Sequence, residues 1–287
     1  MDLTQLRMFC AVADCGSVTL AARELHRVPS NLTTRLKQLE NELGVALFIR
    51  EHPRLTLSQH GHHLLVYARR ILALSDEARV ALTCQGPAGP LRLGSMECTA
   101  AVLLPGLLAR YHRDYPAVAL SLKTGSTREL RHALATGEIS AAFVDGPVPA
   151  GDLEARAVMD DELVLVTDRE RATVRTARDL GDDVVFTFRP GCSYRDRMEA
   201  WYAADGARPG GIQEIHSYHA MLGCVASGAG VAMMPASVVA TLPGHDAVAC
   251  HRLAPEHARV TTWLIWPRQG GSPAIDALSR LAAPAQR

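Results

Sequence analysis

The chain has 287 residues, of which 48% are hydrophobic and 21% are charged, and its 30 basic and 30 acidic residues leave no formal net charge. These values are typical of globular proteins and exclude a disordered chain, a collagen and a pure coiled coil. The length predicts one large domain or two ordinary ones. Seven cysteines are too few for a disulfide scaffold, and their odd number favours a reducing compartment.

Targeting and membrane segments are not expected. The N-terminal residues lack the basic and apolar stretches of a secretory signal, which predicts a cytoplasmic protein. An uncharged segment between Glu214 and Asp246 is long enough to span a bilayer, but glycines and Pro235 interrupt it. This pattern favours a short helix, a glycine turn and a buried strand at Val231–Met234, so we expect no membrane partner.

The first sixty residues predict three short helices. Apolar residues recur at helical spacing over residues 3–13, and Gly16 and Ser17 suit the end of that helix and the N-cap of a second one at 18–25. Pro29 fits the first turn of a third helix. Its apolar stripe ends before Gly44 and consists of Leu32, Leu36, Leu39 and Leu43.

The free face of the third helix is a candidate surface for DNA. Residues 1–88 hold 10 basic and 8 acidic residues, whereas residues 89–287 hold 20 and 22, so any nucleic-acid site must be a local patch. From Arg27 to Lys37 there are basic residues and no acids. The candidate contacts to phosphates and base edges are Arg27, Ser30, Asn31, Thr33, Thr34, Arg35 and Lys37. The alternative is an ordinary solvated helix face.

Residues 48–57 predict a β-wing beside this helix. Two short apolar strands flank a turn that contains Pro53, and Arg50 and Arg54 near the tip could reach backbone phosphates. Two helices joined by a tight turn and followed by a wing describe a winged helix-turn-helix.

The order of the motifs in this region resembles a known family. The motifs are Phe9-x-x-Val12-Ala13, Gly16-Ser17, Ala21-Ala22-x-x-Leu25-His26, Leu39-Glu40-x-Glu42-Leu43-Gly44-x-x-Leu47-Phe48-x-Arg50 and Leu55-Thr56-Leu57-Ser58-x-x-Gly61. They resemble the winged helix-turn-helix and the start of the linker helix of LysR-type transcriptional regulators. The third helix of that family commonly opens with a hydroxyl residue and Gln, where this chain has Val28 and Pro29. Ser30, Asn31 and Arg35 therefore become the better candidates for base contacts.

A long linker helix is expected over residues 58–84. Ser58 can cap it, and its apolar stripe alternates spacings of four and three residues, which is a heptad pattern. The candidate dimer contacts are Leu64, Ala68, Ile71, Leu72, Ala78 and Leu82. The alternative is packing against the chain's own domain. Residues 85–90, rich in Gly and Pro, are expected to form a hinge.

From Leu91 onward strands and helices alternate, which predicts an α/β domain with mainly parallel sheets. It resembles the two-lobed effector domain of the same family, which is similar to periplasmic solute-binding proteins. The expected fold is thus an all-α winged helix-turn-helix domain at 1–57, a long linker helix at 58–84 and an α/β effector domain of two lobes at 91–287. The lobes are expected at about 91–162 with 267–287, and at about 163–266.

Loops that follow the strands predict an effector site between the lobes. In such sheets ligands bind beyond the carboxyl ends of the strands, near helix N-termini, where anions are favoured. The candidate contacts are Ser95, Met96, Glu97, Cys98, Thr99, Ser126, Thr127, Arg189, Cys192, Ser193, Tyr194 and His216. We expect a small organic anion, a carboxylate. The alternative for each loop is ordinary helix capping by Ser or Thr.

Two further alternatives rest on thiols. Cys98 and Cys192 fall on loops that face the same predicted cleft, and a thiol at a helix N-terminus has a lowered pKa, so a redox or electrophile sensor is open. Cys192 with His216 or His219 could form a nucleophile and base, but no catalytic motif surrounds them. We expect no enzyme, no cofactor and no metal site.

Together these patterns predict an effector-responsive transcription factor. Its expected partners are double-stranded DNA with an inverted repeat, a small-molecule co-inducer and a second copy of itself, and RNA polymerase is a further candidate. The family resemblance implies a tetramer built from two dimers.

Overall fold

The computed structural model describes residues 1–51, 54–83, 86–148 and 151–283, without the side chains of Arg50, Glu51, Arg54, Glu77, Val80, Ala81 and Thr83. The chain divides near Gly89 into an N-terminal and a C-terminal unit, and each unit is taken by itself.

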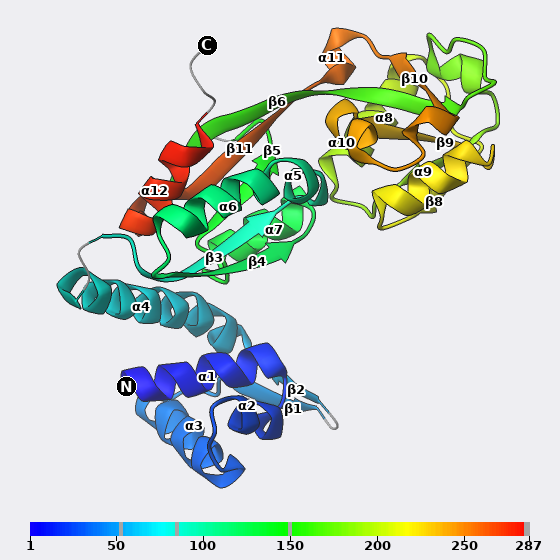
Figure 1. Ribbon diagram of the computed structural model, residues 1–287. Coiled ribbons are helices and arrows are strands. Elements are labelled where there is room, and N and C mark those ends of the chain that lie inside the picture. Colours follow the sequence, from blue (N-terminus) through cyan, green and yellow to red (C-terminus); the bar gives the residue numbers. More distant parts are fainter. Residues whose placement is uncertain (52–53, 84–85, 149–150, 284–287) are drawn as a thin grey trace. The chain divides into compact units, whose positions relative to one another are not determined.

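The N-terminal unit contains three short helices, a two-stranded wing and one long helix (Figure 1). The elements are α1 (Leu3–Cys15), α2 (Val18–Glu24), α3 (Pro29–Leu43), β1 (Phe48–Glu51), β2 (Arg54–Leu57) and α4 (Gln59–Thr83). The helices, wing and linker helix expected from the sequence are all present.

Local capping signals determine where the short helices begin and end. Gly16 and Gly44 end α1 and α3 with φ angles of 61° and 71°, a left-handed conformation that glycine adopts without steric cost. The Ser17 hydroxyl accepts a hydrogen bond from the Leu20 N–H as the N-cap of α2. Pro29 is the first residue of α3. These four assignments are confirmed.

The core of the N-terminal unit is built from the apolar faces of α1, α2 and α3. Phe9 and Leu32 are fully buried, and the Phe9 ring lies 5.5 Å from that of Phe48 at the start of the wing. The Glu40 carboxylate on α3 accepts a hydrogen bond of 2.8 Å from the backbone N–H of Leu47. The ring packing holds the wing against α1, and the hydrogen bond holds the residue that precedes the wing against α3.

The long helix α4 divides its apolar residues between two environments. Ala68 is fully buried in the core of its own domain, and Leu64 and Leu72 pack against the same core. Contact of Ala68 with a second copy was therefore wrongly predicted, because the heptad stripe packs partly on α1. The contacts predicted for the half-buried Leu64 and Leu72 stay a prediction. The large apolar side chains that α4 leaves exposed are Tyr67, Ile71, Leu74 and Leu82, and Ala78 is exposed between them.

The C-terminal unit is one mixed sheet with helices on its faces. Its strands are β3 (Gly89–Ser95), β4 (Val118–Thr124), β5 (Ala141–Asp145), β6 (Leu153–Asp168), β7 (Val184–Thr187), β8 (Gly211–Glu214), β9 (Val231–Pro235), β10 (Val248–Arg252) and β11 (Arg259–Pro267). The helices are α5 (Glu97–Val102), α6 (Leu104–Asp114), α7 (Thr127–Ala135), α8 (Ser193–Ala204), α9 (Tyr218–Ala226), α10 (Ala236–Thr241), α11 (Pro255–Ala258) and α12 (Pro273–Ala282). Short 3₁₀ turns are η1 (Ala177–Leu180), η2 (His245–Ala247) and η3 (Arg268–Gly270).

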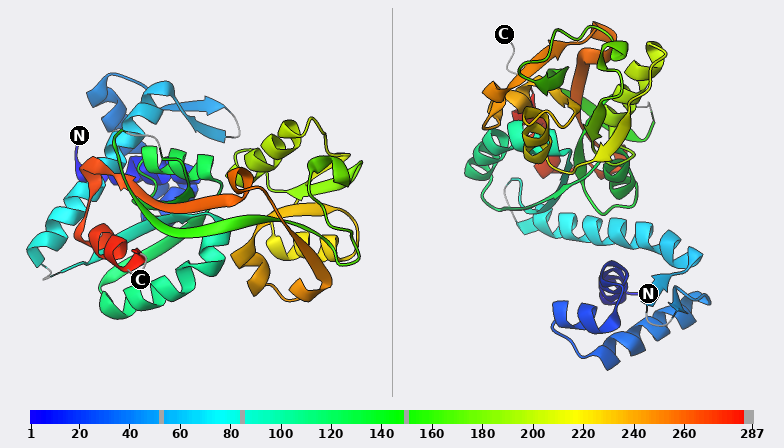
Figure 2. Two further views of the ribbon diagram at one scale, coloured as in Figure 1. Left: turned by 90° about the horizontal axis from the view of Figure 1, so that it is seen from above. Right: turned by 90° about the vertical axis from the view of Figure 1, so that its right-hand side faces the viewer.

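Two long strands connect the lobes of this unit (Figure 2). The strand order is β4-β3-β5-β11-β6-β9-β7-β8, and β10 pairs with β6. Residues 153–162 of β6 pair antiparallel with β11, whereas residues 163–166 pair with β9. Residues 262–265 of β11 pair antiparallel with β5. A register shift, or β-bulge, lies between Thr262 and Trp263.

This topology corrects two expectations. The sheet is mixed rather than mainly parallel, because β6 and β11 run antiparallel to their neighbours. The second lobe was expected to extend to residue 266, but residues 262–265 of β11 pair with β5 of the first lobe. The boundary expected after residue 162 lies within the continuous strand β6, at the point where the pairing of that strand changes from β11 to β9.

Each lobe has its own apolar packing. In the first lobe α6 and α12 cover one face of the sheet, where Leu107 and Leu278 are buried and the Tyr111 hydroxyl donates to the Ala274 carbonyl at 2.8 Å. In the second lobe α8 and α9 pack on β7 and β9 through buried residues such as Trp201 and Met221. The uncharged segment expected as a short helix and a buried strand forms α9 and β9, as predicted.

The first prediction concerns Gly61 in α4. A Cβ at this position would lie 2.1 Å from the Leu47 carbonyl oxygen, so alanine cannot fit unless the backbone moves. Gly61→Ala should lower the free energy of unfolding of the N-terminal domain by about 1–3 kcal/mol. Calorimetric melting of the purified protein measures the change. Gly106→Ala on α6, where a Cβ meets nothing within 4 Å, is the control and should be neutral or slightly stabilising. Equal unfolding midpoints for the two variants would contradict the close contact between Gly61 and the Leu47 carbonyl.

Candidate functional site

The first candidate surface is the exposed face of α3. Leu32, Leu36 and Leu39 point into the core, and the opposite face carries the polar residues expected from the sequence. Of these, Thr33 is half-buried, and the exposed residues are Arg27, Ser30, Asn31, Thr34, Arg35 and Lys37. A helix with its apolar stripe buried and a polar, acid-free start exposed has the form needed to enter a major groove.

The side chains on this face differ in the hydrogen bonds and ion pairs that they form within the protein. Thr33 and Thr34 donate their hydroxyl protons to the Pro29 and Ser30 carbonyls at 3.0 Å, so within the helix their oxygens are available as acceptors. The Arg35 guanidinium lies 4.0 Å from the Asp2 carboxylate, and both side chains are about half exposed. Exposed ion pairs of this kind contribute little, so Arg35 can exchange Asp2 for a nucleic-acid acceptor.

The wing lies beside α3 in the N-terminal unit. Strands β1 and β2 pair antiparallel, with Phe48 opposite Leu57. The side chains of Arg50 and Arg54 lie outside the part of the chain that is described, so their contact with phosphates stays a prediction.

The second candidate site is a cavity of about 520 Å³ in the C-terminal unit. It is lined from both lobes by Met96, Glu97, Cys98, Thr124, Gly125, Ser126, Thr127, Phe188, Arg189, Cys192, Ser193, Tyr194, His216 and Tyr218. The loops after β3, β4, β7 and β8 therefore meet at one place. They bring together ten of the twelve residues expected to contact an effector.

Two expected contacts do not reach the cavity. Ser95 and Thr99 are fully buried, and the Ser95 hydroxyl donates to the Met96 carbonyl at 2.9 Å. Both were wrong because the chain after β3 turns them into the core. Phe188 was missed, since an apolar residue at the end of a buried strand gives no signal of a binding site. Its ring packs edge-on against Tyr218 at 4.9 Å between centroids, which forms an aromatic wall.

Three helices begin at or next to the cavity. Met96 is the N-cap of α5, Cys192 the N-cap of α8 and Ser217 the N-cap of α9, and the Ser217 hydroxyl accepts from the Ala220 N–H. Helix N-termini carry partial positive charge from unpaired N–H groups. The cavity therefore favours a ligand with an acceptor or an anionic group.

Burial controls the titration of groups at the cavity. It raises the pKa of Glu97, opposed by a hydrogen bond from the Tyr218 N–H and by His216 and His219. Beneath the cavity, Asp145 at the end of β5 pairs with Arg197 of α8 at 3.3 Å. Burial raises the pKa of Asp145, and the Arg197 charge opposes this shift. A buried ion pair thus joins the two lobes under the site.

The thiols at the cavity are not activated. The Cys98 sulfur lies 3.5 Å from the Tyr194 hydroxyl, and burial raises the pKa of Cys98 to about 11. Burial also raises the pKa of Cys192. The expected lowering of these pKa values was wrong, because desolvation of the thiolate exceeds the effect of the helix N-termini.

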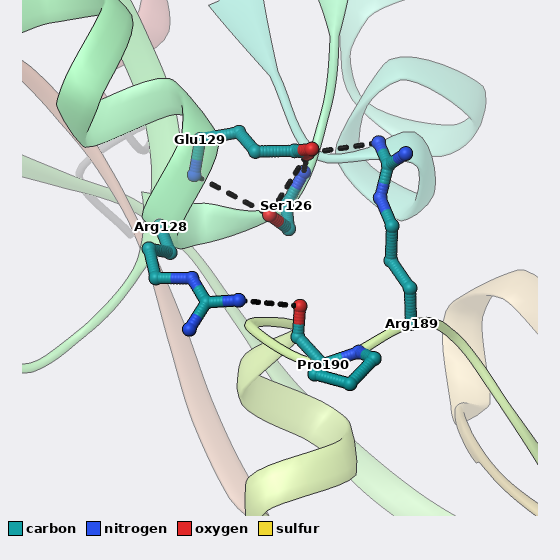
Figure 3. Close-up of polar contacts among 5 residues, drawn as sticks. All are labelled: Ser126, Arg128, Glu129, Arg189 and Pro190. Carbon is teal, nitrogen blue, oxygen red and sulfur yellow. Dashed lines mark hydrogen bonds and ion pairs between the residues drawn. The ribbon is translucent and has the colours of Figure 1, made fainter.

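Figure 3 shows polar contacts that cross the cleft between the lobes. The Glu129 carboxylate on α7 accepts from the Arg189 guanidinium at 2.8 Å and from the Ser126 N–H and hydroxyl, each at 2.9 Å. Beside it, the Arg128 guanidinium donates to the Pro190 carbonyl at 3.0 Å. The N-terminal end of α7 is thereby tied to the loop after β7.

Comparison with known proteins identifies the family. The bacterial regulatory helix-turn-helix protein, lysR family, matches residues 3–62, and the LysR substrate binding domain matches residues 85–287. The chain belongs to the family of LysR-type transcriptional regulators. This confirms the family and the fold that the sequence motifs predicted.

The relatives are regulators along their whole length. The HTH-type transcriptional regulator GltR of Bacillus subtilis (strain 168) is 36% identical over 266 residues, covering 92% of this chain and 90% of that protein. An uncharacterized HTH-type transcriptional regulator, YusT, of the same organism is 38% identical over 256 residues, covering 89% and 85%. These relatives are transcriptional regulators, in agreement with the expectation that the chain is not an enzyme.

Solved structures share the fold. A full-length OxyR variant from Pseudomonas aeruginosa has a TM-score of 0.76 at 24% identity and covers 98% of this regulator and 94% of that chain. Full-length CbnR complexed with its target DNA has a TM-score of 0.68 at 25% identity and covers 98% and 99%. Within the described residues, no helix combines the length and hydropathy that crossing a membrane requires.

A thiol-labelling experiment tests the state of the cavity. Because burial raises the pKa of Cys98 to about 11, little of this thiol is ionised at pH 8. Cys98 should therefore react with iodoacetamide far more slowly than exposed Cys250, as measured by mass spectrometry over time. In urea the two rates should become similar. Faster labelling of Cys98 than of Cys250 in the folded protein would contradict the burial argument.

Proposed function

We propose that this regulator binds double-stranded DNA through α3 and the wing, and that a small organic anion in the cleft of the effector domain controls that binding. The observation that carries the proposal is the cavity itself, lined from both lobes by hydroxyls, helix N-termini and Arg189. A cavity of this size accommodates a small metabolite. Arginine and helix N-termini favour a carboxylate over a neutral ligand.

DNA recognition by α3 is supported by its exposed polar face. Ser30, Asn31 and Arg35 are exposed near the start of α3, and they are the residues proposed to reach base edges in the major groove. Arg50 and Arg54 of the wing are proposed to contact backbone phosphates, as is Lys37. Full-length CbnR, which shares this fold, was solved in complex with its target DNA, and this supports the same mode of action here.

A dimer through α4 is proposed from the apolar side chains that this helix leaves uncovered. Tyr67, Leu74 and Leu82 are 62%, 65% and 89% exposed, and they fall on one side with Ile71 and Ala78. Exposed apolar residues at heptad spacing are favourable only when covered by a partner. A two-fold dimer predicts inverted-repeat half-sites about one helical turn, ~10 bp, apart or a multiple of it. We further propose a tetramer of two dimers, a cytoplasmic location and contact with RNA polymerase.

Effector binding can act only by favouring one arrangement of the lobes. The ligand contacts both lobes, so it stabilises the arrangement in which both sets of contacts form. If DNA also prefers one of the two arrangements, effector binding and DNA binding are coupled, and the effector changes the affinity of the protein for DNA. The raised thiol pKa values of Cys98 and Cys192 disfavour the redox alternative.

Arg35→Ala tests the proposed base contact. Loss of an arginine that contacts a guanine edge should weaken the free energy of binding to the selected sequence by about 1–3 kcal/mol, and should change binding to unrelated DNA little. The ratio of the two dissociation constants should fall about ten-fold or more, measured on a sequence selected from a randomised pool. Arg113→Ala removes an equally charged, exposed side chain from α6 and should leave the ratio unchanged. An unaltered ratio in Arg35→Ala would remove the base contact from the proposal.

A thermal-shift panel of small carboxylates, amino acids and aromatic acids tests the effector site. A ligand at 100 times its dissociation constant should add about 2.7 kcal/mol to the stability of the folded state. Arg189→Gln should lose the shift, because Arg189 lines the cavity. Arg268→Gln is the control, since Arg268 is exposed and pairs with Glu154 outside the cavity lining. A hit that binds both variants equally would place the effector elsewhere.

A further inference from the structure

Glu129 closes the capping box of α7: its N–H donates to the Ser126 hydroxyl at 3.3 Å, and its carboxylate accepts hydrogen bonds from both lobes. A single oxygen, Oε2, accepts from the Ser126 N–H, the Ser126 hydroxyl and the Arg189 guanidinium, at 2.9, 2.9 and 2.8 Å. Two donors come from the loop that opens α7 in the first lobe, and the third comes from the loop after β7 in the second lobe. This combination of a backbone N–H, a hydroxyl and a guanidinium is what a carboxylate ligand requires.

These donors are also the ones that the cavity offers to a ligand. Ser126 and Arg189 line the cavity, whereas Glu129 approaches them from outside its lining. The Arg189 guanidinium forms its ion pair with Glu129. A carboxylate of the chain itself therefore satisfies the anion-binding groups of the cleft.

The contact is ionic but exchangeable. The hydrogen bond from the Ser126 N–H, with the Ser126 hydroxyl and Arg189, lowers the pKa of Glu129, so its carboxylate is ionised at neutral pH. The Arg189 and Glu129 side chains are 50% and 43% exposed, so water can reach the pair. Ion pairs exposed to this degree favour the paired state by at most about five-fold. Another carboxylate can therefore compete with Glu129 for Arg189.

A second contact holds the same two elements together without Glu129. The Arg128 guanidinium donates to the Pro190 carbonyl, and a Cβ at Gly191 would lie 2.7 Å from the Arg128 Nε. Gly191 also has a φ of 96°, a conformation that other residues rarely adopt. The Arg128 contact is made to backbone, so it does not depend on a ligand charge. The loops can remain together while Arg189 changes partner.

We propose that Glu129 occupies the carboxylate subsite of the cleft when no effector is present, and that a monocarboxylate effector binds by replacing Glu129 on Ser126 and Arg189. The inference rests on the proposed function, because it assumes that the cleft is the effector site. The effector group that binds Ser126 and Arg189 is then a carboxylate, and the residue that it displaces is Glu129. An amide or ester of the same ligand carries no charge for Arg189 and does not displace Glu129.

Acetate provides the test, because it reproduces the carboxylate that Glu129→Ala removes. In the purified full-length Glu129→Ala variant, millimolar acetate should raise the unfolding midpoint in a saturable manner, with chloride at the same ionic strength as reference. The wild type should need up to about five-fold more acetate for the same rise, because its own carboxylate competes for the subsite. Acetamide should have no effect on either protein. Adding Arg189→Gln to Glu129→Ala should abolish the acetate effect.

Glu154→Ala is the matched control. Glu154 pairs with Arg268 at 2.9 Å, and their side chains are 45% and 66% exposed, close to the 43% and 50% of Glu129 and Arg189, but neither Glu154 nor Arg268 lines the cavity. Acetate should stabilise this variant no more than it stabilises the wild type. Equal stabilisation of the wild type and of Glu129→Ala, or none of either, would overturn the proposal.

Glu129→Gln offers a second test that preserves side-chain volume. Any carboxylate found in the panel should bind Glu129→Gln up to about five-fold tighter than the wild type, because an uncharged amide competes less well for Arg189. Unchanged or weaker binding would overturn the exchange. These failures remain distinct from failure of the proposed function: panel ligands that depend on Arg189 but not on Glu129 would preserve the cleft as the effector site and reject only the displacement of Glu129.

Discussion

The antiparallel pairing of β6 with β11 is the constraint on which the effector domain depends. Residues 153–162 of β6 belong to the ladder of the first lobe, and the next residues pair with β9 in the second lobe. One strand contributes to both ladders. The register of β6 in the first lobe therefore determines which of its residues are left to pair in the second lobe. The loops after β3, β4, β7 and β8 then meet at a common cavity, although they are far apart in the sequence. The ligand site is thus a consequence of strand pairing.

The charges around the cleft are balanced within the chain. Arg189 pairs with Glu129, and Arg197 pairs with Asp145 at 3.3 Å beneath the cavity. The two pairs differ in burial: the Asp145 side chain is 1% exposed, whereas that of Glu129 is 43% exposed. Breaking a buried pair leaves an uncompensated charge, but exposed partners can be exchanged at little cost. The lower pair therefore suits a structural role, and the upper pair suits recognition.

Sequence signals that act within a few residues predicted some elements of the molecule correctly and missed those that depend on distant residues. Gly16, Ser17 and Pro29 act on their own helix ends, so the short helices could be predicted, and the rule for strand ends located most of the cavity. The first half of β6 was missed because Asp160 and Asp161 interrupt its apolar pattern, and their partners Thr261 and Ser237 are distant in sequence. Burial of Ala68 and of Cys98 depends on tertiary packing. The role of Glu129 likewise depends on Arg189, which lies 60 residues away.

The β-bulge between Thr262 and Trp263 has a mechanical consequence. It interrupts the register of the β6 and β11 ladder, and a bulge bends and twists a strand while the hydrogen bonds on either side remain. Two strands that pass through both lobes resist stretching and sliding, since either movement would break many backbone hydrogen bonds at once. The lobes therefore have few degrees of freedom relative to each other. The bulge lies within the first lobe, where Thr262 and Trp263 also pair with β5, so its bend aims the two connecting strands toward the second lobe.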